Sequence, residues 1–228
     1  MDKKLLSLFQ LCDSNFPSGG FSHSFGMETY IQQKRVTNSE TFSQWLSMYL
    51  QHQLVTADGL AIKLAYNAFK NNDTHKIWHL DHLLTIQNLS FEGREGTRFM
   101  GRSLIKIAKT LYNSSLLFEY DKRVKNKESF AHPAIVFALI GQHLKLSKDI
   151  TIQFYMYSTI INLVQNAVRA IPIGQTAGQQ IINAFQSKIQ KSIATINALN
   201  ESDFGTIAPG IEMAQMQHEN LTVRIFMS

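Results

Sequence analysis

Cysteine, proline and charged residues are all scarce in this chain. Among its 228 residues there is one cysteine, Cys12, there are four prolines, and 17% of the residues are charged. A single cysteine excludes an internal disulfide and a zinc site built from cysteines. Between Pro17 and Pro133 there are 115 residues without proline. Such a stretch is typical of helices, because proline removes a backbone donor and clashes with the preceding turn.

The chain also lacks an apolar run that could cross a membrane. A spanning helix needs about 20 predominantly apolar residues. The most apolar stretch, residues 150–171, contains four amide side chains and Arg169, and polar groups of this kind are rare within a bilayer. We therefore expect a soluble, cytoplasmic protein without a membrane partner.

Sequence signatures of enzymes are missing as well. The chain has no P-loop, no HExxH motif, no EF-hand loop and no GxGxxG motif. Ser22 and His23 are adjacent, and neighbouring side chains rarely point at each other. The residue two beyond Ser22 is Ser24, where a nucleophile elbow has glycine. We predict a non-catalytic protein that has no catalytic residues and binds no cofactor.

What the chain does contain indicates a helical globular protein. Apolar residues make up 44% of it, the ordinary range for a protein with a buried core. Residues that favour helix fill the periodic stretches, and neither strict alternation nor an Asn-Gly or Asp-Gly hairpin signal appears. We predict an all-α fold, with a single-domain bundle of roughly eight to ten helices over residues 1–200. Residues 201–228 are predicted to be a C-terminal tail that binds a partner.

Caps and prolines place the expected helices. Ser39 is a plausible N-cap, Pro133 occupies a first helical position, where its missing N–H does no harm, and Ser147 is a cap candidate with Asp149. The polar segments 121–127 and 202–210 are expected to be loops. The helices are expected over residues 5–12, 25–34, from 39, 60–69, from 74, 92–112, from 133, 147–169 and 175–197.

Three segments combine glycine with polar residues: residues 15–28, 91–102 and 169–179. Glycine weakens an exposed helix by about 1 kcal/mol relative to alanine. The glycines of 91–102 therefore indicate that another backbone approaches this segment closely. Arg94 and Arg102, with Arg98 between them, share a helical face. For each segment two interpretations stay open. One is local structure, namely a tight loop, a solvated face of salt bridges or a helix–turn–helix corner, and the other is a functional surface.

The histidines are the candidate metal ligands of this chain. His75, His79 and His82 share a helical face that lies opposite the apolar one and therefore faces solvent. Neutral imidazoles at this spacing can hold nickel, copper or zinc, but without a carboxylate or cysteine nearby they make a weak site. We predict no metal site and keep His23 and these three as the candidates.

Taken together, the segments resemble the family of the urease accessory protein UreF over nearly the whole chain. Residues 11–28 are similar to the family's N-terminal signature, 92–102 to its central motif, 169–175 to its third block and 218–228 to its closing motif. Four blocks in the right order make the resemblance specific. The departures are conservative, such as Met27 at a position where leucine is common.

The resemblance implies an all-α homodimer with a role in urease maturation. Members of the family join UreD, also called UreH, and the GTPase UreG on the urease apoprotein, where they help nickel reach the lysine-carbamate site. The family is not itself enzymatic, because the GTP chemistry belongs to UreG. The resemblance therefore predicts a nickel-insertion chaperone: an adaptor that holds its partners in register and modulates the GTPase.

A set of partner-binding residues follows from the resemblance as a hypothesis. The polar groups of the three glycine-rich blocks would form a dimer- and GTPase-binding surface held by directional hydrogen bonds. The tail from Ala208 would be mobile when free and would order on UreD. The predicted residues are Phe16, Pro17, Gly20, Ser22, His23, Ser24, Glu28, Arg94, Glu95, Arg102, Arg169, Pro172, Gly174, Gln175, His218, Glu219 and Arg224.

Two other classes of protein are alternatives to the adaptor. A helical nucleic-acid-binding protein would account for the net charge of +5 and the pI near 9.3. Its basic residues should form one dense patch, which only residues 122–127 approach, so we predict no nucleic-acid partner. A direct nickel carrier would use the surface histidines.

Overall fold

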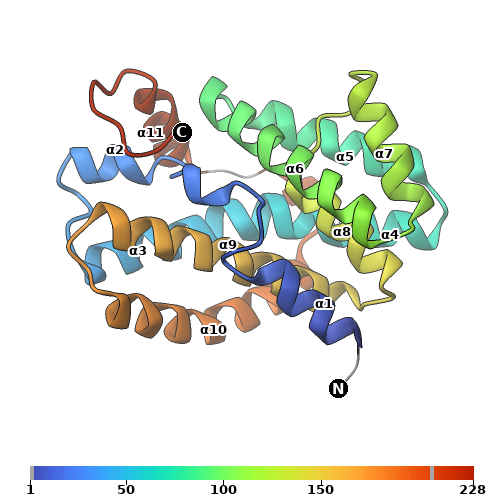
Figure 1. Ribbon diagram of the computed structural model, residues 1–228, viewed down its shortest axis with the longest axis horizontal. Helices are drawn as coiled ribbons and strands as arrows, with labels where there is room; N and C mark the ends of the chain where they lie inside the picture. Colours follow the sequence, from blue (N-terminus) through green and yellow to red (C-terminus); the bar gives the residue numbers. More distant parts are fainter. Residues whose placement is uncertain (1–2, 206–207) are drawn as a thin grey trace.

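The computed structural model of the chain describes residues 3–205 and 208–228, and every regular element in these two ranges is a helix (Figure 1). The predicted all-α class is therefore confirmed. In chain order the elements are α1 (Lys3–Cys12), η1 (Gly20–Ser22), α2 (Met27–Gln32), α3 (Ser39–Tyr49), η2 (Leu50–Gly59), α4 (Leu60–Lys70), α5 (Thr74–Gln87), α6 (Phe91–Leu111), α7 (Ser115–Lys125), α8 (Pro133–His143), α9 (Lys148–Ala170), α10 (Gln175–Ala198), η3 (Glu201–Asp203) and α11 (Pro209–His218).

Helix α8 forms the centre of the bundle. Every residue from Pro133 to Gly141 is buried, as expected for a helix with neighbours on all sides. Helices α4, α6 and α9 pack directly against it, and α5 and α7 complete its surroundings. The long helices α9 and α10 form a hairpin in which α9 crosses the middle of the molecule and α10 lies along its lower edge (Figure 1). No helix within the described ranges is both long enough and apolar enough to span a bilayer.

Local capping explains where several helices begin. Pro133 stands in the first turn of α8, and the Ser147 hydroxyl accepts a hydrogen bond from the Ile150 N–H at 3.3 Å, as the sequence predicts. The start of α3 differs by one residue. Its N-cap is Asn38, whose side chain accepts from Thr41, so Ser39 is the first helical residue instead of the cap.

The segment 121–127 was expected to be a loop, and this prediction is wrong. Helix α7 continues to Lys125 because Leu117 and Tyr120 are buried on its inner face. Basic residues fill its last turn, where the negative end of the helix dipole favours them. Polarity alone therefore did not identify a loop here, since the packed side chains lie one turn earlier.

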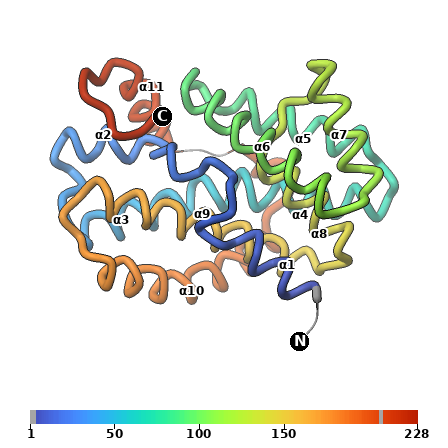
Figure 2. Tube along the Cα trace, viewed as in Figure 1, coloured from blue at the N-terminus to red at the C-terminus, as the bar shows by residue number. Residues whose placement is uncertain are grey.

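The tail also contains helix α11, with Pro209 in its first turn. The sequence did not predict this helix. Ile211 and Ala214 are buried, and α11 lies against α2 and α6. The trace then turns back so that the last residues lie beside residues 22–24 (Figure 2). The tail is thus folded onto the bundle, and its predicted binding of a partner stays a prediction. Residues 1–2 and 206–207 of the two predicted regions lie outside the described residues.

A candidate partner-binding site where the tail meets the bundle

The last residues of the tail pair with the loop that precedes α2. The Met227 N–H donates to the Ser22 carbonyl at 2.8 Å, and the Ser24 N–H donates to the Ser228 carbonyl at 2.6 Å. These backbone hydrogen bonds join segments that are about 200 residues apart in the chain. The first and last of the four sequence blocks therefore lie side by side.

Glu28 holds the tail from within the bundle. Its side chain is 1% exposed, and its two carboxylate oxygens accept the N–H groups of Ile225 at 2.6 Å and Phe226 at 3.0 Å. A third contact joins it to His218 Nε2 at 3.0 Å. A buried carboxylate is costly unless it is paired and hydrogen-bonded, and here the tail supplies all three of these partners.

His218 lies between two carboxylates. It is fully buried, with Nε2 on Glu28 and Nδ1 2.7 Å from Glu92. Since an ionised carboxylate can only accept, both ring nitrogens donate when His218 is an imidazolium. Arg224 reaches the other oxygen of Glu92 at 2.5 Å. Burial works to raise the pKa of Glu92, but hydrogen bonds from His218 and Arg224 outweigh it, so this pKa lies below its ordinary value. We call Glu28, Glu92, His218 and Arg224 the latch.

An acidic side chain of the tail also contacts the first turn of helix α6. Glu219 accepts from the Phe91 N–H at 2.9 Å and from the Glu92 N–H at 3.4 Å. These N–H groups have no partner within the helix, and the positive end of the helix dipole favours a carboxylate there. Nearby, Glu212 accepts from the Leu89 N–H at 3.0 Å. The tail is therefore tied to the α5–α6 junction as well as to α2.

His23 contacts the end of the tail where the tail meets the bundle. It is 3% exposed, and Nδ1 lies 2.8 Å from the Ser228 hydroxyl. Burial, and then the charge of His218, lowers its pKa to about 4, so this ring is neutral near pH 7. A Cβ added at Gly96 would lie 2.6 Å from Nδ1. At Gly96 α6 therefore approaches the His23 side chain, whereas the close backbone approach that the sequence predicts for residues 91–102 is found at Gly101, against the carbonyl of Ala131.

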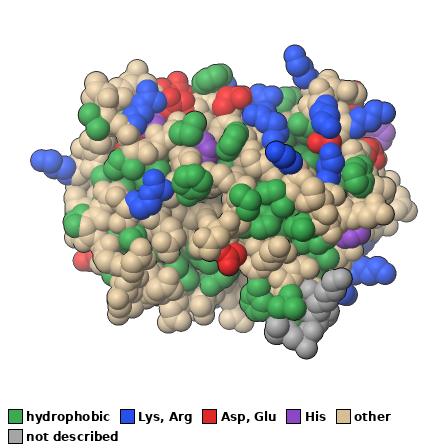
Figure 3. Space-filling model, viewed as in Figure 1, with side chains coloured by type: hydrophobic (Ala, Val, Ile, Leu, Met, Phe, Trp, Pro, Cys, Tyr) green, Lys and Arg blue, Asp and Glu red, His purple; other side chains and the backbone are tan. Residues whose placement is uncertain are grey.

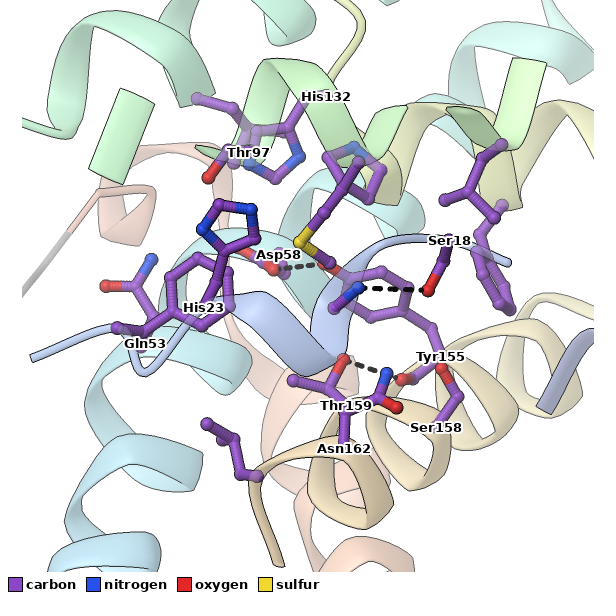
Figure 4. A pocket seen from close by; sticks show the side chains of 18 of the residues that line it. Ser18, His23, Gln53, Asp58, Thr97, His132, Tyr155, Ser158, Thr159 and Asn162 are labelled. Carbon is purple, nitrogen blue, oxygen red and sulfur yellow. Dashed lines mark hydrogen bonds between the residues drawn. The ribbon is translucent and has the colours of Figure 1, made fainter. Parts of the chain in front are cut away.

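His23 also lines a cavity of about 70 Å³ with both polar and apolar walls, which Figure 4 shows from close by. Asp58 and Tyr155 both line it, and the Tyr155 hydroxyl donates a hydrogen bond to the Asp58 carboxylate. Burial raises the pKa of Asp58 to about 6, against the opposing effect of that hydrogen bond. His23 Nε2 and one oxygen of Asp58 have no hydrogen-bond partner among the described residues. In proteins, buried polar groups of this kind are ordinarily satisfied by water where a cavity of this size adjoins them.

The third sequence block supports the junction from α9. The Arg169 guanidinium donates to the Phe21 carbonyl at 2.8 Å and lies 5.2 Å from the centre of the Phe226 ring. One turn earlier, the Asn166 amide donates to the carbonyls of His23 at 2.9 Å and Gly20 at 3.2 Å. These contacts hold the N-terminal loop in the shape that receives the tail.

Some residues of this junction were not among those predicted from the sequence. Glu92 and Asn166 are the most important, together with Phe226 and Ser228. A signal existed for Asn166, because an amide in the middle of a strongly apolar helical stretch either faces solvent or has a buried partner, and this one is fully buried. The pairing of Glu92 has no comparable signal in the sequence.

Other predicted residues lie outside the junction. Arg94 donates to the carbonyls of Asn88 and Leu89 at 2.8 and 2.9 Å, which stabilises the start of its own helix. Glu95 pairs with Arg98 at 2.5 Å on the helix surface. The structure leaves Phe16 half-buried and exposes Pro17, Arg102, Pro172, Gly174 and Gln175.

The candidate metal ligands do not converge. His75, His79 and His82 are exposed on α5, as predicted, and His23 is buried against Ser228. Within residues 3–205 and 208–228, no group of three or more His, Cys, Asp or Glu side chains is arranged to hold a metal ion.

The family model described as UreF matches residues 36–186. The chain belongs to the UreF family. It is 48% identical over 225 residues to the urease accessory protein UreF of Bacillus sp. (strain TB-90), with 99% of each chain covered. It is 52% identical over 228 residues to the urease accessory protein UreF of Lachnoclostridium phytofermentans, with 100% of each covered.

These matches confirm the resemblance seen in the sequence. The UreF match contains Glu92 and Arg169 but ends before the tail and begins after the N-terminal loop. The two relatives align over these outer segments too. The latch of this UreF-family chain therefore joins residues inside the matched region to residues outside it.

Proposed function

We propose that this chain is a urease accessory protein that acts as a non-catalytic adaptor in nickel insertion. The observation that carries the proposal is the sequence identity of 48% and 52%, over nearly the full length, to two proteins named urease accessory protein UreF. In this role the chain works with UreD, also called UreH, and with the GTPase UreG on the urease apoprotein. It modulates the GTPase without catalysing a step, acts as a homodimer, and works in the cytoplasm.

The tail is the surface we propose for partner binding. Its inner side holds the latch and buried apolar side chains such as Ile211 and Phe226, whereas its outer side exposes several large apolar side chains to solvent. Exposed apolar patches of this kind mark interaction sites. The outward side chains are Met213 (58% exposed), Met216 (47%), Val223 (71%), Ile225 (49%) and Met227 (68%).

The latch gives this surface a fixed shape before a partner arrives. His218 and Arg224 are held by Glu28 and Glu92, so they contribute to binding by positioning the tail. A surface that is already ordered loses less conformational entropy on association. We therefore infer that the partner binds the docked tail, in place of the mobile tail that the sequence interpretation expected.

The outer face can be tested without disturbing the latch. We expect a V223S/M227S variant to keep the helical circular dichroism of the parent protein and to lose about tenfold in affinity for UreD or UreH, because two exposed apolar contacts are removed. The control is L6S/I150S, which removes two exposed apolar side chains from α1 and α9. Affinity is measured by titration calorimetry and function by urease activity in cells.

The latch is tested separately by charge reversal. R224E places a carboxylate beside Glu92 and should lower both complex formation and urease activity. The combination E92R/R224E restores opposite charges and should recover part of the loss. If V223S/M227S and R224E both leave the complex and the urease activity unchanged, the tail is not the binding surface.

A further inference from the structure

The net positive charge of the chain is concentrated in one helical hairpin. Residues 91–128 contain nine Lys and Arg residues against five Asp and Glu, and therefore carry +4 of the total +5. The other 190 residues are nearly neutral. The hairpin consists of α6 and α7, which pack against each other, and in Figure 3 the Lys and Arg side chains gather over this part of the molecule.

The basic residues of the two helices form one surface. Arg98, Arg102, Lys106 and Lys109 follow each other at spacings of four, four and three, so they line one face of α6. Lys109 pairs with Asp121 of α7 at 2.5 Å, and this pair places that face of α6 along the seam with α7. The stripe on α6 and the basic last turn of α7 are therefore continuous.

Part of this charge is not neutralised within the chain. Arg102, Lys106 and Lys122 are exposed, and their side chains make no hydrogen bond or ion pair with the residues that the structure describes. By contrast, Lys125 shares Asp121, and Arg123 pairs with a glutamate. Three free cations on one side of a hairpin raise the local potential and attract an acidic partner.

Apolar and acidic groups lie within the same surface. Phe99, which follows Arg98 in α6, is 52% exposed and Phe118 is 44% exposed, and the Lys109 ammonium lies 5.7 Å from the centre of the Phe118 ring. Glu95 pairs with Arg98, and Asp121 pairs with Lys109 and Lys125, so carboxylates lie among the basic residues, which disfavours a continuous polyphosphate backbone. A protein face that places separate carboxylates around apolar side chains complements this pattern.

We propose that the α6–α7 face is a second docking surface, which binds a protein face rich in Asp and Glu that surround apolar residues. This surface lies apart from the outer face of the tail and does not depend on the accessory role. Opposite charges at such an interface mainly raise the association rate and select the partner. Binding on this face should therefore weaken steeply as salt is added.

The test uses a synthetic peptide in which Glu and Asp alternate with Leu and Phe, and a matched peptide with Gln and Asn in place of the acids. We expect the acidic peptide alone to bind the full chain, with amide shift changes confined to α6 and α7. The variant R102Q/K106Q/K122Q should weaken this binding about tenfold. The control K70Q/K145Q/K191Q, which removes the same net charge from exposed positions elsewhere, should change it less than twofold.

Two results would overturn the proposal. Equal weakening by both triple variants would show that only net charge matters and that the α6–α7 face has no special role. Tighter binding of a short DNA duplex than of the peptide, lost in R102Q/K106Q/K122Q, would assign this face to nucleic acid. All substituted side chains are exposed, so both variants are expected to fold, which circular dichroism checks.

Discussion

Replacement of Gly101 by alanine tests the packing of α6 against the core. A Cβ at this position would lie 1.5 Å from the carbonyl oxygen of Ala131 and 2.5 Å from its carbonyl carbon. The obstacle is backbone, so no side-chain rotation relieves it, and α6 and the segment 130–132 must move apart. That segment is held by Asp81, which accepts the N–H groups of Phe130 at 2.6 Å and His132 at 2.9 Å.

The cost of this movement can be worked out from its parts. Overpacking of a core costs about 1–3 kcal/mol, and weakening two buried hydrogen bonds to a carboxylate costs about 1.5–3 kcal/mol each. The better helix propensity of alanine offsets about 1 kcal/mol. We therefore expect Gly101→Ala to lower the free energy of unfolding by about 3 kcal/mol or more, and the melting temperature by about 6–12 °C.

The measurement is urea unfolding followed by circular dichroism, with Gly174→Ala as the matched control. Gly174 has φ −76°, and a Cβ there would meet no atom within 4 Å, so its replacement should change the stability by less than about 0.5 kcal/mol. A loss below about 1 kcal/mol for Gly101→Ala would refute the close approach of α6 and residue 131.

Two further predictions concern buried titratable groups. Because burial raises the pKa of Asp58 from 3.8 to about 6, its contribution to stability is present below pH 4 and is lost as the pH rises through 6. Asp58→Asn should remove this loss of about 3 kcal/mol, and an unchanged pH profile of urea unfolding would contradict it. Burial also raises the pKa of Cys12 to about 12, and its thiol donates to the Phe154 carbonyl at 3.4 Å. We expect iodoacetamide to label Cys12 at pH 8 about 100-fold more slowly in the native protein than in urea, as followed by mass spectrometry; equal rates would show that the thiol is accessible.

Most of the helices could be predicted from local signals. Pro133 and Ser147 each mark a helix start through the chemistry of the first turn, and the structure bears out both. The same reasoning failed for α7, because its last turn is a polar segment and its buried apolar residues, Leu117 and Tyr120, come earlier in the helix. It also missed α11, although Pro209 was a usable start signal.

The candidate site, too, was predicted from the sequence only in part. The sequence alone identified the blocks that contain Glu28, Arg169 and His218, and it predicted a close approach at the glycines of 91–102. It did not show that Glu28 and Glu92 both reach His218. It also did not show that the cationic residues of α6 and α7 form one surface.

The sequence by itself determined the helical class and most helix starts, because capping and periodicity act over a few residues. The family followed from the resemblance of four blocks that are each continuous in the chain. Only the tertiary structure decided which buried charges pair. Glu28 and Glu92 are 64 positions apart, and His218 comes 126 positions after Glu92. Residues so far apart meet because α2, α6 and α11 pack together. Burial in that packed junction is also what makes the paired charges necessary, since an unpaired carboxylate there would be costly.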